Sequence, residues 1–154
     1  MNVRGDEYSG TGPQIAAREN DLETMKCMLE GFTTDQKYDV LKIQTGNDFS
    51  ALHYAAWSGY SSVITYLLTD LSQQQKYNLI QLQDRYGATL LHDAASFQKP
   101  EAVQAILSSL SLQQQMQLLN MKNKKGQTVA DIKPELYQKH PALISLGIVL
   151  LHRL

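Results

Sequence analysis

The feature that most constrains the fold of this chain is its similarity to itself at a spacing of 39 residues. The stretches "ALHYAAWSGY" (51–60) and "LLHDAASFQK" (90–99) each contain a His-x-Ala-Ala core, at His53 and His92. The same spacing aligns a column of hydroxyl residues, namely Thr11, Ser50, Thr89 and Thr128. A fixed period of this length is typical of stacked structural units, each of which buries its apolar face against the next. The sequence therefore predicts a repeat solenoid.

Each unit contains the pattern of two antiparallel helices. In the second unit, Ser50 is a suitable N-cap, and Gly59 can end the helix in a left-handed conformation. The following stretch, "SSVITYLLTDL" (61–71), places its apolar residues on one stripe of a second helix. A pair of helices cannot cover its own apolar face, so we expect it to pack against neighbouring copies.

A further segment recurs at 33–44, 72–83 and 111–122. Each copy opens with Ser or Thr and has Gln three residues later, which is the pattern of a capping box. We therefore expect a short third helix in each unit, with its glutamines on a solvated face. A polar turn follows each of these segments, and it requires a positive φ at Asp48, Gly87 and Gly126.

The composition is that of an ordinary globular protein and excludes several classes. The 154 residues are 43% hydrophobic and 19% charged, which is enough for one domain with a core, and the net charge of −1 gives no reason to expect nucleic acid as partner. The cluster of Lys122, Lys124 and Lys125 is interpreted as a solvated turn rather than a phosphate site. The apolar run at 142–151 is about half the length that a membrane-spanning helix needs, so no membrane span is expected.

The N-terminal residues lack the apolar region of a secretory signal, and one cysteine allows no internal disulfide. This cysteine usage suits a reducing compartment. Because Cys27 stands at helical spacing with Met28 and Leu29, we expect it to be a buried small hydrophobe rather than a nucleophile.

The two histidines raise the question of catalysis or metal binding. Equivalent residues on adjacent stacked helices lie about 10 Å apart, which is too far to share a metal ion. The chain has no metalloprotease, phosphate-loop, Cys-x-x-Cys or nucleophile-elbow motif. We therefore expect no catalytic residues, no metal, no cofactor and no enzymatic activity.

The stretches "GATLLHDAA" (87–95) and "DFSALHYAAWSGYSSVITYLL" (48–68) resemble ankyrin repeats, whose core reads Gly-x-Thr-Pro-Leu-His-x-Ala-Ala. Ala51 and Leu90 replace the usual proline, and 39 residues exceed the usual period of about 33 by the length of the third helix. The resemblance implies an all-α solenoid, with a single domain at 1–154 made of about four helical-hairpin repeats. Their expected boundaries are 11–49, 50–88, 89–127 and 128–154, with the less regular first and last repeats as caps.

In ankyrin repeats the histidine of this core hydrogen-bonds to backbone and ties neighbouring repeats together, so the resemblance gives His53 and His92 a structural role. It also implies that a protein partner meets the concave surface, made of turn tips and the exposed face of each first helix. By column, this surface comprises Asn47, Phe49, Tyr54, Trp57, Ser58, Arg85, Tyr86, Asp93, Ser96, Phe97, Lys124 and Lys125. Its aromatic side chains are of the kind that dominates protein interfaces. The alternative is that Trp57 and Phe97 pack between helices.

The function expected from this resemblance is a non-enzymatic protein–protein interaction module. The long repeat is similar to that of ankyrin proteins from host-associated bacteria and their phages, which predicts a host-directed effector. Such a protein would be cytoplasmic, or delivered into a host cell without a recognisable N-terminal signal. The alternative is an accessory or targeting domain of a larger enzyme or complex. The apolar segment 142–151 is either a closing helix or the contact surface of a homodimer.

Overall fold

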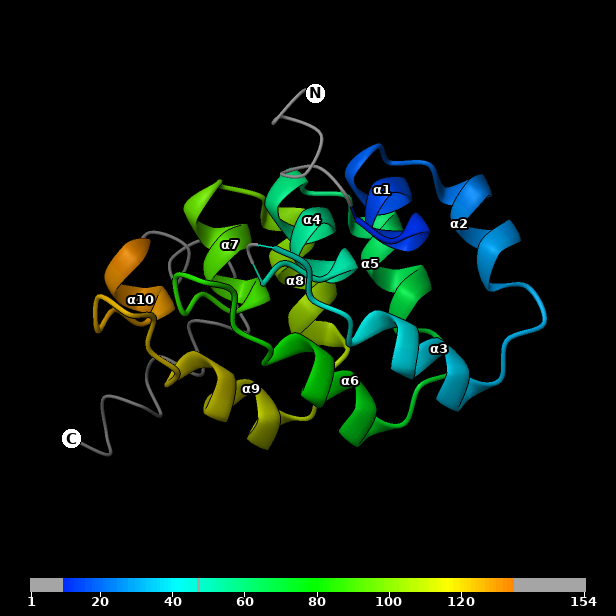
Figure 1. Cartoon of the computed structure of the whole chain (residues 1–154). Helices are drawn as coiled ribbons and strands as arrows, with labels where there is room; N and C mark the ends of the chain where they lie inside the picture. Colours follow the sequence, from blue (N-terminus) through cyan, green and yellow to red (C-terminus); the bar gives the residue numbers. More distant parts are fainter. Residues whose placement is uncertain (1–9, 47, 135–154) are drawn as a thin grey trace, which may run out of the picture.

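A computed structural model describes residues 10–46 and 48–134, and its helices form three rows (Figure 1). The first row contains α1 (Gly12–Arg18), α4 (Ala51–Ser58), α7 (Leu90–Ser96) and α10 (Val129–Ile132). The second row contains α2 (Leu22–Leu29), α5 (Ser61–Leu68) and α8 (Pro100–Ser108). The third row contains α3 (Thr34–Leu41), α6 (Gln73–Ile80) and α9 (Leu112–Leu119). The prediction of a stacked all-α solenoid is confirmed.

The stack is held together by small and aliphatic side chains at equivalent positions of the first two rows. In the first row, α1 packs on α4, α4 on α7 and α7 on α10; in the second, α5 packs on α8. The alanine pairs 55–56 and 94–95 are fully buried, and they permit close approach of neighbouring helices. Leu52 and Leu91, which share a column, are also fully buried. Residues 51–58 and 90–97 therefore lie side by side, as the repeat pattern predicts.

Each first helix begins with the same local hydrogen bonds. The N-cap hydroxyl accepts from the amide three residues later, and the side chain of that later residue accepts from the N-cap amide. The later residue is Gln14 in α1, His53 in α4, His92 in α7 and Asp131 in α10. The histidines thus close capping boxes, a role that the sequence pattern alone does not reveal.

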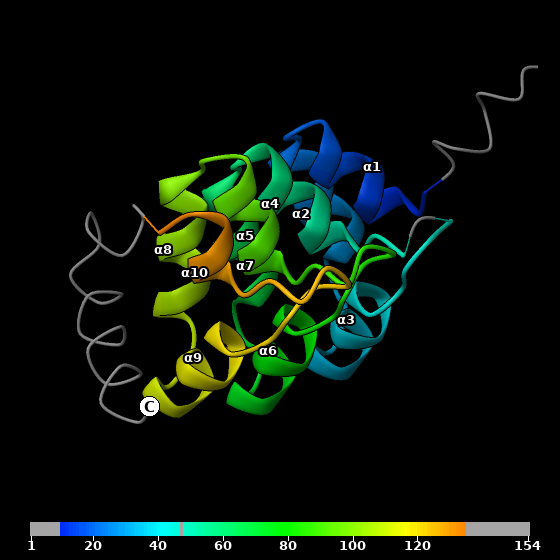
Figure 2. The ribbon, with the colours of Figure 1, turned by 90° about the vertical axis from the view of Figure 1, so that its left-hand side faces the viewer.

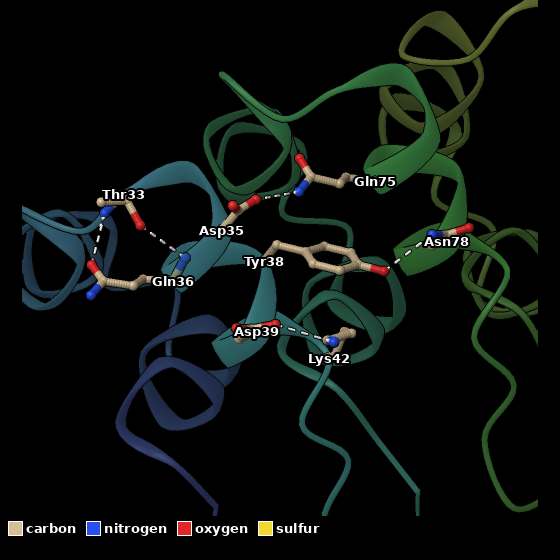
Figure 3. Close-up of polar contacts among 8 residues, drawn as sticks. All are labelled: Thr33, Asp35, Gln36, Tyr38, Asp39, Lys42, Gln75 and Asn78. Atoms are coloured by element: carbon tan, nitrogen blue, oxygen red, sulfur yellow. Dashed lines mark hydrogen bonds and ion pairs between the residues drawn. The ribbon is translucent and has the colours of Figure 1, made fainter.

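The third helices also begin with capping boxes, at Thr33, Ser72 and Ser111, as predicted. Their glutamines do more than face solvent, because they also connect neighbouring units. Between α3 and α6, the Gln75 amide donates to Asp35 at 3.1 Å and the Asn78 amide donates to the Tyr38 hydroxyl at 3.1 Å (Figure 3). Between α6 and α9, the Gln73 side-chain amide donates to the side-chain oxygen Oε1 of Gln114 at 2.8 Å.

The turns between units lie next to one another along one side of the stack (Figure 2). The amide of Lys124 donates to the Tyr86 carbonyl at 3.0 Å, which joins two successive turns directly. Gly87 has φ of 72°, and a Cβ atom there would stand 2.7 Å from the Lys124 nitrogen. Glycine is therefore required at this position both for its conformation and for the close backbone contact. Asp48 and Gly126 adopt the predicted positive φ as well.

Part of the predicted architecture lies outside the described residues. This part comprises Asn47 and residues 135–154, which include most of the fourth repeat and the apolar segment 142–151. Within the described ranges, no helix combines the length and the hydropathy needed to cross a bilayer.

Candidate functional site

Four aromatic side chains on or next to α4 and α7 form one continuous surface group, which we call the aromatic cluster: Phe49, Tyr54, Trp57 and Phe97. The Phe49 and Trp57 rings stack at 5.8 Å between centroids, and Trp57 meets Phe97 at 5.3 Å. Tyr54 lies 5.6 Å from Phe49. Phe49 precedes the N-cap of α4, whereas Phe97 is the C-cap of α7, so the cluster crosses the boundary between two units.

The largest members of the aromatic cluster remain in contact with solvent. Trp57 retains 40% and Phe97 48% of its accessible surface, so each ring is partly covered by its neighbours and partly open to solvent. Tyr54 and Phe49 are half-buried, and Tyr54 packs against the core. The rings hold one another in place and leave apolar faces and edges exposed, which is typical of residues that anchor a protein interface.

Next to the aromatic cluster lies an open cavity of about 510 Å³. It is bounded by α7, by α10 and by the turns that follow α6 and α9. The structure brings many of the predicted partner-binding residues together in its lining, namely Arg85, Tyr86, Asp93, Ser96, Phe97, Lys124 and Lys125. Tyr86 is 62% exposed, and the Arg85 guanidinium lies 5.9 Å from its ring centre. Ser58 is half-buried near the end of α4 and does not line this cavity.

Asp93 departs from its predicted position on an open surface, because the structure buries it to 9% exposure. Its Oδ2 atom makes no hydrogen bond within the described residues. Burial and the nearby charge of Asp84 raise the pKa of Asp93 to about 8. The carboxyl group is therefore mainly neutral at pH 7, and it contributes little charge to the cavity that it lines.

Gln14, His53 and His92 occupy equivalent positions in the first three units, and they differ in how they contact the following unit. Gln14 donates to the carbonyl of Phe49 at 3.2 Å, and His92 Nε2 donates to the carbonyl of Gln127 at 3.0 Å. For His53, the equivalent acceptor is the carbonyl of Ala88. This carbonyl opposes the lowering of the His53 pKa by burial, but it forms no hydrogen bond with Nε2. Burial lowers the pKa of both histidines, so both rings are neutral at pH 7.

His53, Asp84 and Asp93 are brought close enough to suggest a metal site. Their ligand atoms lie within 4.8 Å of one another, and all three residues are buried. However, His53 Nδ1 accepts from the Ser50 amide at 3.2 Å, so the hydrogen of the neutral ring resides on Nε2. A metal ion would need the lone pair of Nε2, which would move the ring hydrogen to Nδ1, where it would face the hydrogen of the Ser50 amide. The three residues thus do not fit a metal ion.

Sequence reasoning missed two residues of this region. Asp84 opens its turn by accepting from the amides of Tyr86 at 2.8 Å and Ala88 at 3.0 Å, as Asn123 does in the next turn. Asp84 and Asn123 stand 39 residues apart at equivalent positions, and this match in the sequence could have indicated their shared role in the turns. Gln14 stands 39 residues before His53 and fulfils the same capping role without being a histidine.

The prediction for Cys27 is wrong, because this side chain is exposed. Cys27 lies on α2, in a column whose members in the next two units, Tyr66 and Ala105, are only half-buried, so this column lies at the edge of the packed helix face.

Comparison with known proteins supports the ankyrin-type stack of helices described above. A family model described as ankyrin repeats (3 copies) matches residues 14–120, while no curated protein matches the chain. A chain in the crystal structure of the yeast ribosomal protein Rps3 with its chaperone Yar1 is similar at a TM-score of 0.66. It shares 16% identity, over 100% of this chain and 95% of that one.

The ankyrin repeat domain of Bcl-3, a member of the IkappaB family, is similar at a TM-score of 0.68 and 22% identity. This match covers 94% of the present chain and 57% of the Bcl-3 chain. At these identities the likeness concerns the fold alone.

Proposed function

Because the chain belongs to the ankyrin-repeat family, we propose that it binds a protein partner through the aromatic cluster and the adjoining cavity. Ankyrin repeats are in general protein–protein interaction modules, and the fold is typically non-enzymatic. The proposal adds to this general role a specific surface on this chain.

The observation that carries the proposal is the exposure of Trp57 and Phe97 in the aromatic cluster. The columns that stack the units are filled by Ala, Leu, Ile and Val, whose burial accounts for the fold. Trp57 and Phe97 are not needed for that burial, yet they place two large rings in contact at the surface, 5.3 Å apart. Aromatic side chains held rigidly at a surface lose little conformational entropy on binding, which makes them efficient anchors.

Binding a eukaryotic signalling protein as a host-directed effector is a narrower form of the same proposal. Its support is the 39-residue repeat with its third helix, since the similar long repeats belong to ankyrin proteins of host-associated bacteria and phages. This form predicts that the partner is found in eukaryotic rather than bacterial lysate.

Affinity capture from the two lysates with matched variants tests the proposal. The Trp57→Ala, Phe97→Ala double variant should lose a partner that the unaltered protein retains. Phe32→Ala is the matched control, because Phe32 is 43% exposed and lies in the first unit, away from the aromatic cluster. A partner that is retained by the double variant, or lost equally by the control, would contradict the proposed surface.

A further inference from the structure

We propose that the cavity beside the aromatic cluster receives an acidic side chain of the bound protein, next to an apolar side chain that packs on Trp57 and Phe97. This inference rests on the proposed function and specifies the chemistry of the partner. The occupant is an extended segment in which Asp or Glu lies close in sequence to a large apolar residue.

Phe97 connects the two parts of this surface. Its ring touches Trp57 within the aromatic cluster, and it also forms part of the cavity wall. Consecutive residues of an extended chain advance by about 3.3–3.6 Å, so residues one to three positions apart can reach both features. The cavity volume of about 510 Å³ is ample for one acidic side chain and part of its backbone.

The charged groups around the cavity are predominantly cationic. Arg85, Lys124 and Lys125 are exposed and come from two adjacent turns. The turns are fixed to each other by the bond from the Lys124 amide to the Tyr86 carbonyl, which keeps these cations together. A cluster of like charges at the edge of a cavity attracts a group of opposite charge, and this attraction becomes stronger as water is displaced.

The acidic residues of the lining oppose this field only in part. Asp131 Oδ2 accepts from the Thr128 amide at 2.9 Å and from its hydroxyl at 3.1 Å, and these bonds lower its pKa, so Asp131 stays charged and offsets one of the three cations. Asp93 is buried, with its unpartnered oxygen withdrawn from solvent, and it stays mainly protonated at pH 7. The neutral His92 ring is occupied by the Gln127 carbonyl. The cations therefore make the electrostatic potential in the cavity positive.

A protein segment fits this surface better than a nucleic acid does. Nucleic-acid binding depends on a basic stripe that neutralises several successive phosphates, whereas here the cations are confined to two turn tips. The net charge of the whole chain is −1, which gives no long-range attraction for a polyanion. The apolar contact area of the aromatic cluster complements a hydrophobic side chain.

The test is selection of random linear peptides, displayed on phage, on the full chain. Peptides that bind the unaltered protein but not the Trp57→Ala, Phe97→Ala variant should be enriched in Asp or Glu adjacent to Trp, Phe or Leu. One selected peptide is then synthesised, and its Kd is measured against the Lys124→Glu, Lys125→Glu variant. We expect at least about tenfold weakening, and a Kd that rises with added salt in the unaltered protein.

The matched control is Lys26→Glu, Lys42→Glu, which makes the same change in net charge on exposed residues of the first unit. It should alter the Kd by less than about twofold, and its melting temperature should fall only slightly, because the ion pairs of Lys26 with Glu23 and of Lys42 with Asp39 are exposed. Three outcomes would overturn the inference and leave the proposed function standing. The cluster-dependent peptides could be neutral or basic, the two lysine pairs could have equal effects on the Kd, or single-stranded RNA could displace the peptide. Absence of any cluster-dependent peptide would count against both.

Discussion

Two junctions of the stack use equivalent positions for different chemistry. Where α7 meets the next turn and α10, His92 donates to the Gln127 carbonyl, the turn begins with the neutral Asn123, and the position equivalent to Asp93 is Ile132. At the junction that we call the central junction, α4 meets the next turn and α7, and the corresponding residues are His53, Asp84 and Asp93. Here His53 Nε2 and Asp93 Oδ2 are both without a hydrogen-bond partner among the described residues.

The difference shows how little of a repeat has to vary to change its electrostatics. The apolar columns are the same at both junctions, so the helices stack alike. In the column Ile15, Tyr54, Asp93, Ile132, only the third unit carries an ionisable carboxyl group of low intrinsic pKa. Together with Asp84 in place of the neutral Asn123, Asp93 places two carboxyl groups and an imidazole in a buried space, which makes the central junction sensitive to pH.

The largest expected effect tests whether the two junctions share the same apolar core. Leu52→Ala and Leu91→Ala each remove a fully buried side chain at equivalent positions. Each should lower the free energy of unfolding by about 3 kcal/mol, through lost burial and a residual cavity. Urea denaturation of both variants measures this. A loss at one position several times larger than at the other would show that the stacking is not equivalent.

The next effect concerns the charge at the central junction. With its folded pKa raised to about 8, Asp93 holds a proton that the unfolded chain releases near pH 4. At this site the folded state therefore binds more protons, and the contribution of Asp93 to stability falls as the pH rises from about 4 to about 8. Asp93→Asn removes this dependence and should be more stable than the unaltered protein by about 2 kcal/mol or more at pH 8.

Denaturant unfolding curves across this pH range provide the measurement. The two proteins should have nearly equal stability at pH 4 and diverge as the pH increases. Parallel stability profiles would contradict the burial of an uncompensated carboxyl group.

A smaller change makes the central turn resemble its neighbour. In Asp84→Asn, the side-chain oxygen can still accept from the amides of Tyr86 and Ala88, as Asn123 does from the equivalent amides. Loss of the Asp84 charge should lower the pKa of Asp93, which burial nevertheless keeps above its ordinary value. Carbon-13 NMR titration of the Asp93 carboxyl group measures this shift. An unchanged Asp93 pKa would show that the two carboxyl groups do not interact.

The smallest effect is expected from His92→Gln. Gln14 already closes a capping box and donates to the next unit from the same column, so glutamine should reproduce both interactions at position 92. The expected loss of stability is below about 1 kcal/mol, whereas His92→Ala should cost about 2 kcal/mol because the Gln127 carbonyl loses its donor. Thermal unfolding of the two variants separates these values. Equal losses would mean that the imidazole ring, rather than its hydrogen bonds, is what matters.

The stacking could be predicted from sequence because it depends on local patterns that recur. The capping residues, the alanine pairs and the left-handed turn positions are each fixed by short-range physical requirements, and three copies reinforce the interpretation. The third helix could likewise be predicted from its Ser/Thr-x-x-Gln pattern and apolar spacing.

The properties of the central junction could not be predicted, because they depend on contacts between units. The burial of Asp93 follows from the approach of α4 and of the turn that contains Asp84. The cavity likewise exists only because two turns and α10 enclose it. The exposure of Cys27 depends on which face of α2 is packed, which helical spacing does not encode.

The most direct test of the account is a comparison of partner binding with folding in the same variants. We expect Trp57→Ala with Phe97→Ala to weaken the Kd for the captured protein by about 100-fold or more, since two anchors at an interface centre are lost. Phe32→Ala should change the Kd by less than about threefold, and the urea midpoints of all three proteins should nearly coincide. Two results would contradict the assignment of these rings to partner binding. Either the double variant binds with an unchanged Kd, or its urea midpoint falls strongly together with the loss of binding.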